Sequence, residues 1–445
     1  MRNSPYKAEI YLALNIGIAL SMLADKNLSL VLSVLILLIG IARIISKKNT
    51  DGSAHLFAGY VVGIEVLFRM NAGGIGYEYG KYAVIIFFVT AMIFERSKKN
   101  IPPAFIIFML LLIPSIFIAK FPTFDETRQL VSFNLSGPTA LFVSVIYFYQ
   151  RKVPIAQLKK LFLAILYPIV GMSIFIFFRS GSLEDAKFTT ESNFQTSGGF
   201  GPNQVSTMFG LGVLIIAAAY FLRIRLFRIK YLEVVILFGL IIRGFATFSR
   251  GGVLAPIISI LFCIAVMSFT DSKFQAKIGK TVYAFIGIVI VLAAGFYYVN
   301  DISGGKLELR YKGESMYNED KSNLFSGRDE LLMEDIEIFQ KNLLLGVGPG
   351  MASQYRYEIS GIETSAHIEF SRLLSEHGLL GLISILIIII FPINYFFKLN
   401  NPDNKIILLL CTMFVFITMS HAAMRTAVPG FIYGLAYIFI IRPRP

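Results

Sequence analysis

The chain has 445 residues, a length that ordinarily indicates roughly two or three soluble domains. Its composition excludes a soluble enzyme, because 56% of the residues are hydrophobic and only 16% are charged, whereas soluble proteins carry about 25% charged residues. A disordered chain is excluded as well, since disorder requires low hydrophobicity. The net charge of +13 fits the lysine and arginine bias of membrane loops and does not by itself indicate nucleic acid binding. The sequence therefore predicts a polytopic membrane protein.

Apolar runs recur along the whole chain, and a helix needs about 20 such residues to cross the hydrocarbon layer of a bilayer. Some of the runs are short or polar, so we expect an all-α bundle of 12–14 membrane-spanning helices. The runs lie near residues 10–24, 28–45, 54–70, 81–94, 102–119, 131–149, 160–178, 204–222, 231–248, 253–269, 281–298, 378–397, 405–421 and 427–441.

Lysine and arginine gather in alternate connections between these runs, and cytoplasmic loops carry that excess. The pattern places both termini in the cytoplasm and the longest polar segment on the outer face. We therefore expect three parts: a bundle of about eleven helices over 1–298, a large outer loop subdomain over 299–366, and C-terminal membrane helices over 367–445. The two cysteines, Cys263 and Cys411, lie inside apolar runs and imply neither a disulfide framework nor a zinc site.

Two arginines lie near the end of one apolar run. Arg250 stands in the segment FSRGG, and Arg243 lies seven positions earlier. We expect one helix to carry both, nearly two turns apart and on one face. Burying an arginine in a membrane costs about 2.5–3.5 kcal/mol on insertion scales, so such residues usually face a cavity or a partner. Arg250 is therefore a candidate functional residue, with snorkelling to lipid headgroups as the alternative. For Arg243 a structural carboxylate partner is the alternative.

Arg328 and His367 lie in and just after the long polar segment. Arg328 falls in a predicted helix over 327–341, where a surface salt bridge is the simpler interpretation. His367 stands where the loop returns to the membrane, and imidazole titrates near neutral pH. Both residues share the predicted outer face with Arg250, which makes the three a candidate catalytic group.

Charged residues at helical spacing occur in two places. Glu369, Arg372 and Glu376 are three and four residues apart, so a helix would let them pair. Glu65 and Arg69 are four apart within an apolar run, and we expect a structural ion pair there.

Two glycine-containing segments invite comparison with phosphate-binding loops. GVGPG at 346–350 lacks the GxGxxG pattern and predicts a tight turn in which glycine permits positive φ. GPNQ at 201–204 opens a predicted helix, whose first N–H groups could receive an anion beside Asn203.

Four segments, in this order, resemble the bacterial O-antigen polymerase and ligase family of membrane glycosyltransferases. They are GFGPNQ, FSRGG, SGRDELLMEDIEIFQKNLLLGVGPG and SAHIEFSRLLSEHGLLGL, which together cover about residues 198–382. The N-terminal half resembles the family only in its hydropathy. The specificity of the resemblance lies in the order and topology of the segments, because each segment alone is a soft motif.

The resemblance implies a reaction and a location. An oligosaccharide carried on undecaprenyl diphosphate would pass to an acceptor hydroxyl at the periplasmic face of the bacterial inner membrane. It also implies that transfer needs no metal or other cofactor, which agrees with the lack of a carboxylate cluster suited to Mg²⁺ at an outer membrane edge. The expected partners are the lipid-linked donor, a glycan or lipid A core acceptor, membrane lipids and a chain-length regulator, but not nucleic acid.

The family's roles carry over to individual positions of this sequence. Arg250 and Arg328 would neutralise the departing diphosphate, because the guanidinium group pairs bidentately with phosphate oxygens. His367 would take the proton of the acceptor hydroxyl or orient the acceptor. The residues expected to bind substrate or support these three are Asn203, Arg243, Glu369 and Arg372.

We expect a polymerase, because such proteins vary greatly in sequence and the N-terminal half matches nothing specific. A ligase, which would transfer the glycan to the lipid A core, is the alternative. A flippase or secondary transporter for lipid-linked oligosaccharides is a further alternative, but it would more often place charges or broken helices near the middle of the membrane. The candidate residues here gather at one face.

Overall fold

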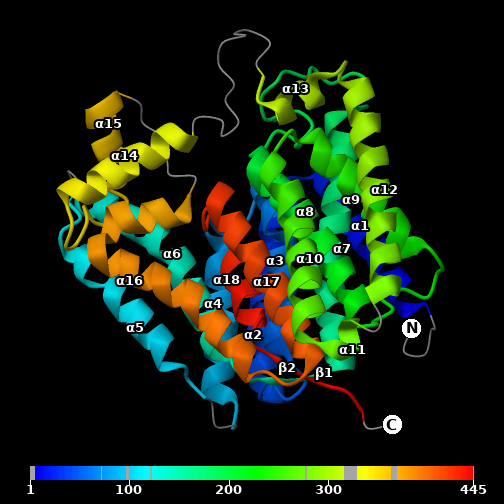
Figure 1. Ribbon diagram of the computed structural model, residues 1–445, viewed down its shortest axis with the longest axis horizontal. Coiled ribbons are helices and arrows are strands. Elements are labelled where there is room, and N and C mark those ends of the chain that lie inside the picture. The colour runs from blue at the N-terminus through cyan, green and yellow to red at the C-terminus, as the bar shows by residue number, and fades with distance from the viewer. Residues whose placement is uncertain are drawn as a thin grey trace.

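The structure, a computed structural model, is almost entirely helical (Figure 1). It describes residues 6–71, 73–96, 100–120, 123–275, 278–314, 328–361 and 368–443. The helices of the first half are α1 (Lys7–Ala24), α2 (Asn27–Lys47), α3 (Ser53–Met70), α4 (Tyr79–Phe94), α5 (Pro103–Leu112), the 3₁₀ turn η1 (Pro114–Phe117), α6 (Phe124–Phe148), α7 (Ile155–Ser180) and α8 (Pro202–Phe221).

The second half continues the helical pattern. Its helices are α9 (Leu232–Ala246), α10 (Arg250–Thr270), α11 (Ser272–Gln275), α12 (Ile278–Ile302), α13 (Lys306–Lys312), α14 (Arg328–Lys341), α15 (Ala352–Ser360), α16 (Glu369–Lys398), α17 (Pro402–His421) and α18 (Val428–Leu435). Two short strands, β1 (Lys152–Pro154) and β2 (Phe439–Ile441), pair in parallel and tie the C-terminal segment to the connection before α7.

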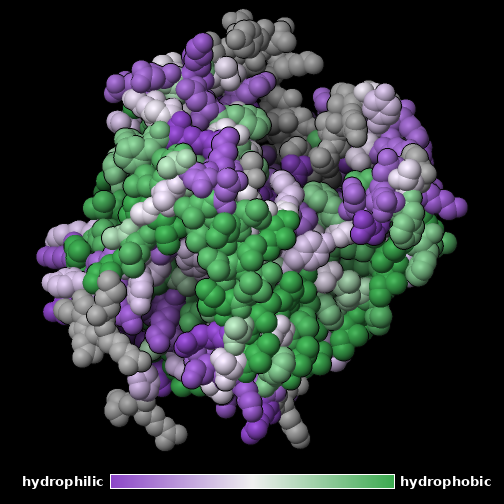
Figure 2. All heavy atoms as spheres, turned by 180° about the vertical axis from the view of Figure 1, so that it is seen from behind, coloured by the Kyte–Doolittle hydropathy of each residue, from purple (hydrophilic) through white to green (hydrophobic). Residues whose placement is uncertain are grey.

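Nine of the described helices are long and apolar enough to cross a membrane, or ten if the bent pair of α12 and α13 counts as one span. The chain is thus an integral membrane protein with many spans. Fewer full-length spans are present among the described residues than the 12–14 expected, because four of the predicted runs form shorter helices. These four helices are α4, α5, α9 and α18. Apolar side chains form most of a broad belt between more hydrophilic ends (Figure 2).

The predicted run at 427–441 differs most from expectation. It forms the eight-residue helix α18 followed by the strand β2. Every residue of α18 is buried, as is Tyr437 beyond it. A segment buried on all sides must be apolar whether or not it faces lipid, so hydropathy alone could not distinguish a membrane span from this interior helix.

Close contact between α8 and α10 depends on glycine. A Cβ atom added to Gly252 would lie 2.3 Å from Ser206, and one added to Gly210 would lie 2.2 Å from the carbonyl oxygen of Gly252. Backbones approach this closely in membrane bundles where small residues line the interface. The contact brings the first turn of α10 against the first turn of α8.

Helix α16 is two helices joined at Gly378, whose φ of 60° and ψ of −138° are not helical. The segment containing 346–350 fills the bend: Val347 and Gly348 donate backbone hydrogen bonds to the carbonyl oxygens of Ser375 and Glu376, at 3.0 and 2.9 Å. The glycines at 346, 348 and 350 have positive φ, which confirms the predicted tight turn. The bend separates a polar first segment of α16, which carries Glu369, Arg372 and Glu376, from the long apolar remainder.

The described parts of the long polar segment lie in two places. Helix α13 follows α12, whereas α14 and α15 pack together against α16 at the other side of the same end of the molecule (Figure 1). A single large loop subdomain over 299–366 is therefore not evident among the described residues. The predicted helix over 327–341 is confirmed as α14, Arg328–Lys341.

Replacing Gly252 by alanine should destabilise the protein, because the added methyl group must push α8 and α10 apart; overpacking of this kind typically costs about 1–3 kcal/mol. Gly239 of α9, around which a Cβ would meet no atom within 4 Å, provides the matched control. We expect Gly252→Ala to lower the midpoint of thermal unfolding in detergent and Gly239→Ala to leave it unchanged or raise it slightly. Equal midpoints for the two variants would contradict the close packing described above.

Candidate functional site

Arg243 and Arg250 belong to different helices, which corrects the expectation that one helix carries both. Helix α9 ends at Ala246, Phe248 adopts a left-handed φ of 56°, and Arg250 is the first residue of α10. The Thr247 side chain donates to the Gly244 carbonyl and accepts the Ser249 backbone N–H. Threonine and serine offer the backbone such alternatives to helical bonding, and a helix break within a continuous apolar run is hard to predict from hydropathy.

Arg243 is buried in the last turn of α9, with its guanidinium carbon 5.2 Å from the centre of the Phe177 ring. A cation over an aromatic face is stabilised without a carboxylate. Arg243 forms no ion pair with a carboxylate among the described residues, so its packing on Phe177 and not a structural carboxylate stabilises it there.

Arg250 lies half-buried where α10 meets α13. Its Nη1 donates to the carbonyl oxygen of Arg310 at 3.1 Å, and Arg310 in turn donates through Nε to the carbonyl oxygen of Phe248 at 3.4 Å. Lys306, on the same short helix as Arg310, donates to the carbonyl oxygen of Phe188. Three cationic side chains are thus gathered near the start of α10 and along α13.

A largely apolar groove of about 1000 Å³ begins beside this cationic group, between α9, α10, α12 and α13. Val253 and Leu254, which line it, follow Arg250 by three and four residues and therefore lie one turn along the same face of α10. Ala293 and Phe296 form part of the opposite wall on α12. Polar lining residues, Asn300 and Glu308, stand at the α13 end. The groove therefore has a polar end beside cations and an apolar body.

The segments GFGPNQ and FSRGG meet directly. Ser249 donates to the side-chain oxygen of Asn203 at 2.8 Å, and Ser206 donates to Ser249 at 2.9 Å. Asn203 lies in the first turn of α8, which confirms that GPNQ opens a helix. Asn203 therefore holds the start of α10, and with it Arg250, against the start of α8.

The next residue, Gln204, extends this contact into a buried ionic network. Its side-chain oxygen accepts from Arg69 at 2.9 Å. Arg69 pairs with Glu65 at 2.6 Å, which confirms the ion pair expected from their spacing, and lies 3.7 Å from Glu78. Glu78 in turn pairs with Lys81. All of these residues except Gln204 come from α3, α4 and the turn before α4, so the N-terminal half builds part of the same polar region.

The connection between α17 and α18 also contacts this ionic network. Arg69 donates to the carbonyl oxygen of Arg425 at 2.9 Å, and Lys81 donates to that of Met424 at 3.2 Å. The backbone N–H of Met424 donates to Glu369 at 3.2 Å, so the connection joins α3 and α4 to α16. No sequence pattern predicts these contacts of the connection, because its main-chain atoms make them.

Glu369, Arg372 and Glu376 pair as their spacing predicted. Arg372 forms ion pairs with both carboxylates, and its Nη1 also donates to the side-chain oxygen of Asn134 on α6 at 3.3 Å. All three members of the triad are buried. Buried ions require partners of this kind, because an unpaired charge in an apolar environment is costly.

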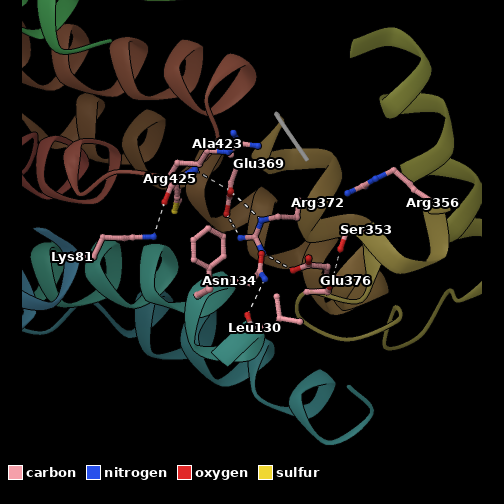
Figure 3. A pocket seen from close by; sticks show the side chains of 13 residues that line it. Lys81, Leu130, Asn134, Ser353, Arg356, Glu369, Arg372, Glu376, Ala423 and Arg425 are labelled. Carbon is pink, nitrogen blue, oxygen red and sulfur yellow. Dashed lines mark hydrogen bonds and ion pairs between the residues drawn. The ribbon is translucent and has the colours of Figure 1, made fainter. Parts of the chain in front are cut away.

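The triad forms one wall of a pocket of about 630 Å³ (Figure 3). Phe133 and Asn134 of α6, Ser353 and Arg356 of α15, Lys81 of α4 and Arg425 surround the triad. In the close view, the side chains of Lys81 and Asn134 approach the triad from α4 and α6, and those of Ser353 and Arg356 come from the opposite side (Figure 3).

Helix α14 is fixed to the polar start of α16 by a buried carboxylate. Asp335 pairs with Arg356 of α15 and accepts from the hydroxyl of Ser371 at 2.6 Å. Burial raises the pKa of the Asp335 carboxyl, while the Arg356 guanidinium and the Ser371 hydroxyl act against that rise. These contacts place the backbone of α14, which begins at Arg328, at the same end of the molecule as the pocket.

The structure therefore brings four of the seven candidate residues into one connected polar region: Asn203, Arg250, Glu369 and Arg372. Arg243 lies apart on α9. The backbone of Arg328 begins α14, but its side chain and the whole of His367 lie outside the described residues. Sequence reasoning missed Lys81, Asn134, Ser353 and Arg356, which carry no motif and join the pocket only through the fold.

Comparison with known proteins identifies the C-terminal part of the chain. A sequence profile of the family described as O-antigen ligase matches residues 235–386, from α9 to the apolar part of α16. Comparisons with curated proteins and with solved structures gave no match. Residues 235–386 therefore form a domain similar to the O-antigen ligase family, whose members are membrane glycosyltransferases of the ligase and polymerase type.

Proposed function

We propose that this protein transfers an oligosaccharide from undecaprenyl diphosphate to an acceptor hydroxyl at the periplasmic face of the bacterial inner membrane. The observation that carries the proposal is the apolar groove that begins beside Arg250 and Arg310. A prenyl diphosphate has the matching two-part chemistry, with an anionic head for the cations and a long hydrocarbon tail for the groove.

The orientation proposed from the loop charges agrees with the arrangement of the elements. Helices α13, α14 and α15 lie at one end of the molecule, and the strands β1 and β2 lie at the opposite end with the C-terminal segment (Figure 1). We place the first end in the periplasm and both termini in the cytoplasm, following the excess of lysine and arginine in the connections near the termini.

The chemical step is a displacement at the anomeric carbon of the donor sugar. The acceptor oxygen forms a bond to that carbon while the bond to the diphosphate oxygen breaks, and the bonding electron pair leaves with the diphosphate. His367 takes the proton of the acceptor hydroxyl. Arg250 and Arg328 neutralise the leaving diphosphate, and arginine suits this task because its guanidinium stays charged and pairs bidentately with phosphate oxygens. We propose no metal ion for this step.

The remaining candidates hold this arrangement in place. Asn203 fixes the start of α10 through Ser249. Glu369 and Arg372 order the polar start of α16, immediately after His367. Preorganised groups of this kind are more effective than mobile ones because their geometry is set before the reaction begins.

Replacing Arg250 by alanine should lower glycan transfer by a purified sample about 100-fold, because losing one preorganised donor to developing charge costs about 10²–10³ in rate. Arg250→Lys should recover only part of the rate, since lysine lacks the bidentate fork. Arg328→Ala and His367→Ala should be similarly inactive. Lys341→Ala, at an exposed lysine of α14, is the control and should match the wild type. The rates are measured with and without EDTA, and sensitivity to the chelator would contradict the arginine mechanism.

The groove predicts a second effect, on the lipid part of the donor. Ala293 of α12 lines the groove, whereas its exposed neighbour Ala294 does not. Ala293→Phe should fill the groove and raise the KM for an undecaprenyl diphosphate donor, with a smaller effect on a donor that has a short prenyl chain. Ala294→Phe should leave both values unchanged. An equal effect of the two variants would show that the donor tail lies elsewhere.

A polymerase and a ligase differ only in the acceptor, and the products in a deletion strain distinguish them. We propose a polymerase and therefore expect that strain to carry single, unextended repeats on its lipopolysaccharide or lipid carrier. Long lipid-linked chains that never reach lipid A would instead identify a ligase. Movement of labelled lipid-linked glycan by the purified protein without covalent transfer would favour a flippase or transporter.

A further inference from the structure

The pocket around Glu369, Arg372 and Glu376 is separate from the donor groove. Its walls come from α4, α6, α15, the start of α16 and the connection between α17 and α18. The groove is formed by α9, α10, α12 and α13, and no residue lines both. The pocket therefore offers a second binding position, whose ligand is indicated by its own chemistry.

Most charges around the pocket are paired. Arg372 lies between the two carboxylates of Glu369 and Glu376, and Lys81 pairs with Glu78 behind the wall. Arg356 pairs with Asp335. Three of the four cations that line the pocket are thus paired with carboxylates. A diphosphate entering here would have to approach buried carboxylates, which repel it, so the pocket is poorly suited to the charged part of the donor.

Neutral groups with remaining hydrogen-bonding capacity also line the pocket. Asn134 uses one amide hydrogen on the carbonyl oxygen of Leu130 and one oxygen lone pair on Arg372, so one donor and one acceptor position remain. Ser353 donates to the carbonyl oxygen of Gly350 and can still accept. The half-buried ring of Phe133 lies beside them. Hydroxyl groups both donate and accept, and an aromatic ring offers an apolar face to a sugar ring.

We propose that this pocket binds the acceptor glycan, through hydrogen bonds that Asn134 donates and accepts, a hydrogen bond that Ser353 accepts, and contact with the face of Phe133. The assignment rests on the function proposed above and deepens it. The pocket is next to the start of α16, which follows the proposed base His367 after a single intervening residue. It is joined to the Arg250 region by Gln204, Arg69 and the carbonyl oxygen of Arg425. Donor and acceptor would thus approach from opposite sides of the network.

Protection from chemical labelling tests the pocket directly. The native cysteines, Cys263 and Cys411, are buried, so a maleimide should react mainly with a cysteine introduced by Ser353→Cys. The probe is the methyl glycoside of the repeating oligosaccharide purified from the host's own surface glycan. At about four times its Kd it should slow labelling about fivefold by simple occupancy. Tyr357→Cys, at an exposed position of the same helix α15, is the matched control and should show no protection.

The outcomes separate this proposal from the general function. Undecaprenyl diphosphate should not protect Ser353→Cys, and protection by it equal to that by the glycoside would assign the pocket to the donor and overturn the proposal. If the wild type transfers glycan but the glycoside gives no protection, the acceptor assignment fails while the transferase function stands. If the wild type transfers no glycan from the lipid carrier, the transferase function itself fails.

A kinetic measurement provides a second, independent variant. Phe133→Leu keeps an apolar side chain but removes the ring, and should raise the KM for the acceptor glycoside about threefold to tenfold. Its KM for the donor and its inhibition by undecaprenyl diphosphate should stay at wild-type values, which also shows that the variant is folded. Phe124→Leu, at an exposed position of the same helix α6, should change neither KM. A rise in the donor KM alone would place the ring in the donor site.

Discussion

Every ionised side chain inside a membrane bundle must have a partner, and this requirement ties the two halves of the chain together. Glu65, Arg69, Glu78 and Lys81 lie in the N-terminal half, where they would be costly to bury alone. Their further contacts include Gln204, Ser136 of α6 and the backbone of the connection between α17 and α18. The same connection bonds Glu369. The ionic network therefore orders the polar end of the molecule, including the main chain of the connection between α17 and α18.

Much of the fold could be predicted from the sequence, because burial in a membrane leaves a strong local pattern. Each of the fourteen apolar runs contains a helix, and the pairs Glu65–Arg69 and Arg372–Glu376 follow from a spacing of four residues. Hydropathy could not predict where each helix ends or whether an apolar helix faces lipid or the protein interior. The break at Phe248 divides the two arginines, and α18 is apolar because it is interior.

The site was predictable in part for a similar reason. Asn203, Arg250, Glu369 and Arg372 lie within recognisable segments, and the fold connects all four. Lys81, Asn134, Ser353 and Arg356 belong to no such segment, and they meet only because α4, α6 and α15 surround the bent start of α16. The bend itself combines a local cause, Gly378, with a distant one, the backbone N–H groups of Val347 and Gly348. Sequence spacing can reveal a local cause such as Gly378, but not a contact with a distant segment.

The same pairing rule also gives the two proposed binding positions different chemistry. Beside the groove, Arg250, Lys306 and Arg310 donate hydrogen bonds to main-chain carbonyls, and cations of this kind attract an anionic head group. Around the pocket Lys81, Arg356 and Arg372 pair with carboxylates, and neutral side chains, Asn134 and Ser353, keep hydrogen-bonding capacity for a ligand. A transferase for two glycans needs this difference, because both substrates carry similar sugars and only the donor must present its diphosphate to arginine. Electrostatics would then decide which substrate occupies which position, while contacts to the sugars contribute affinity at both.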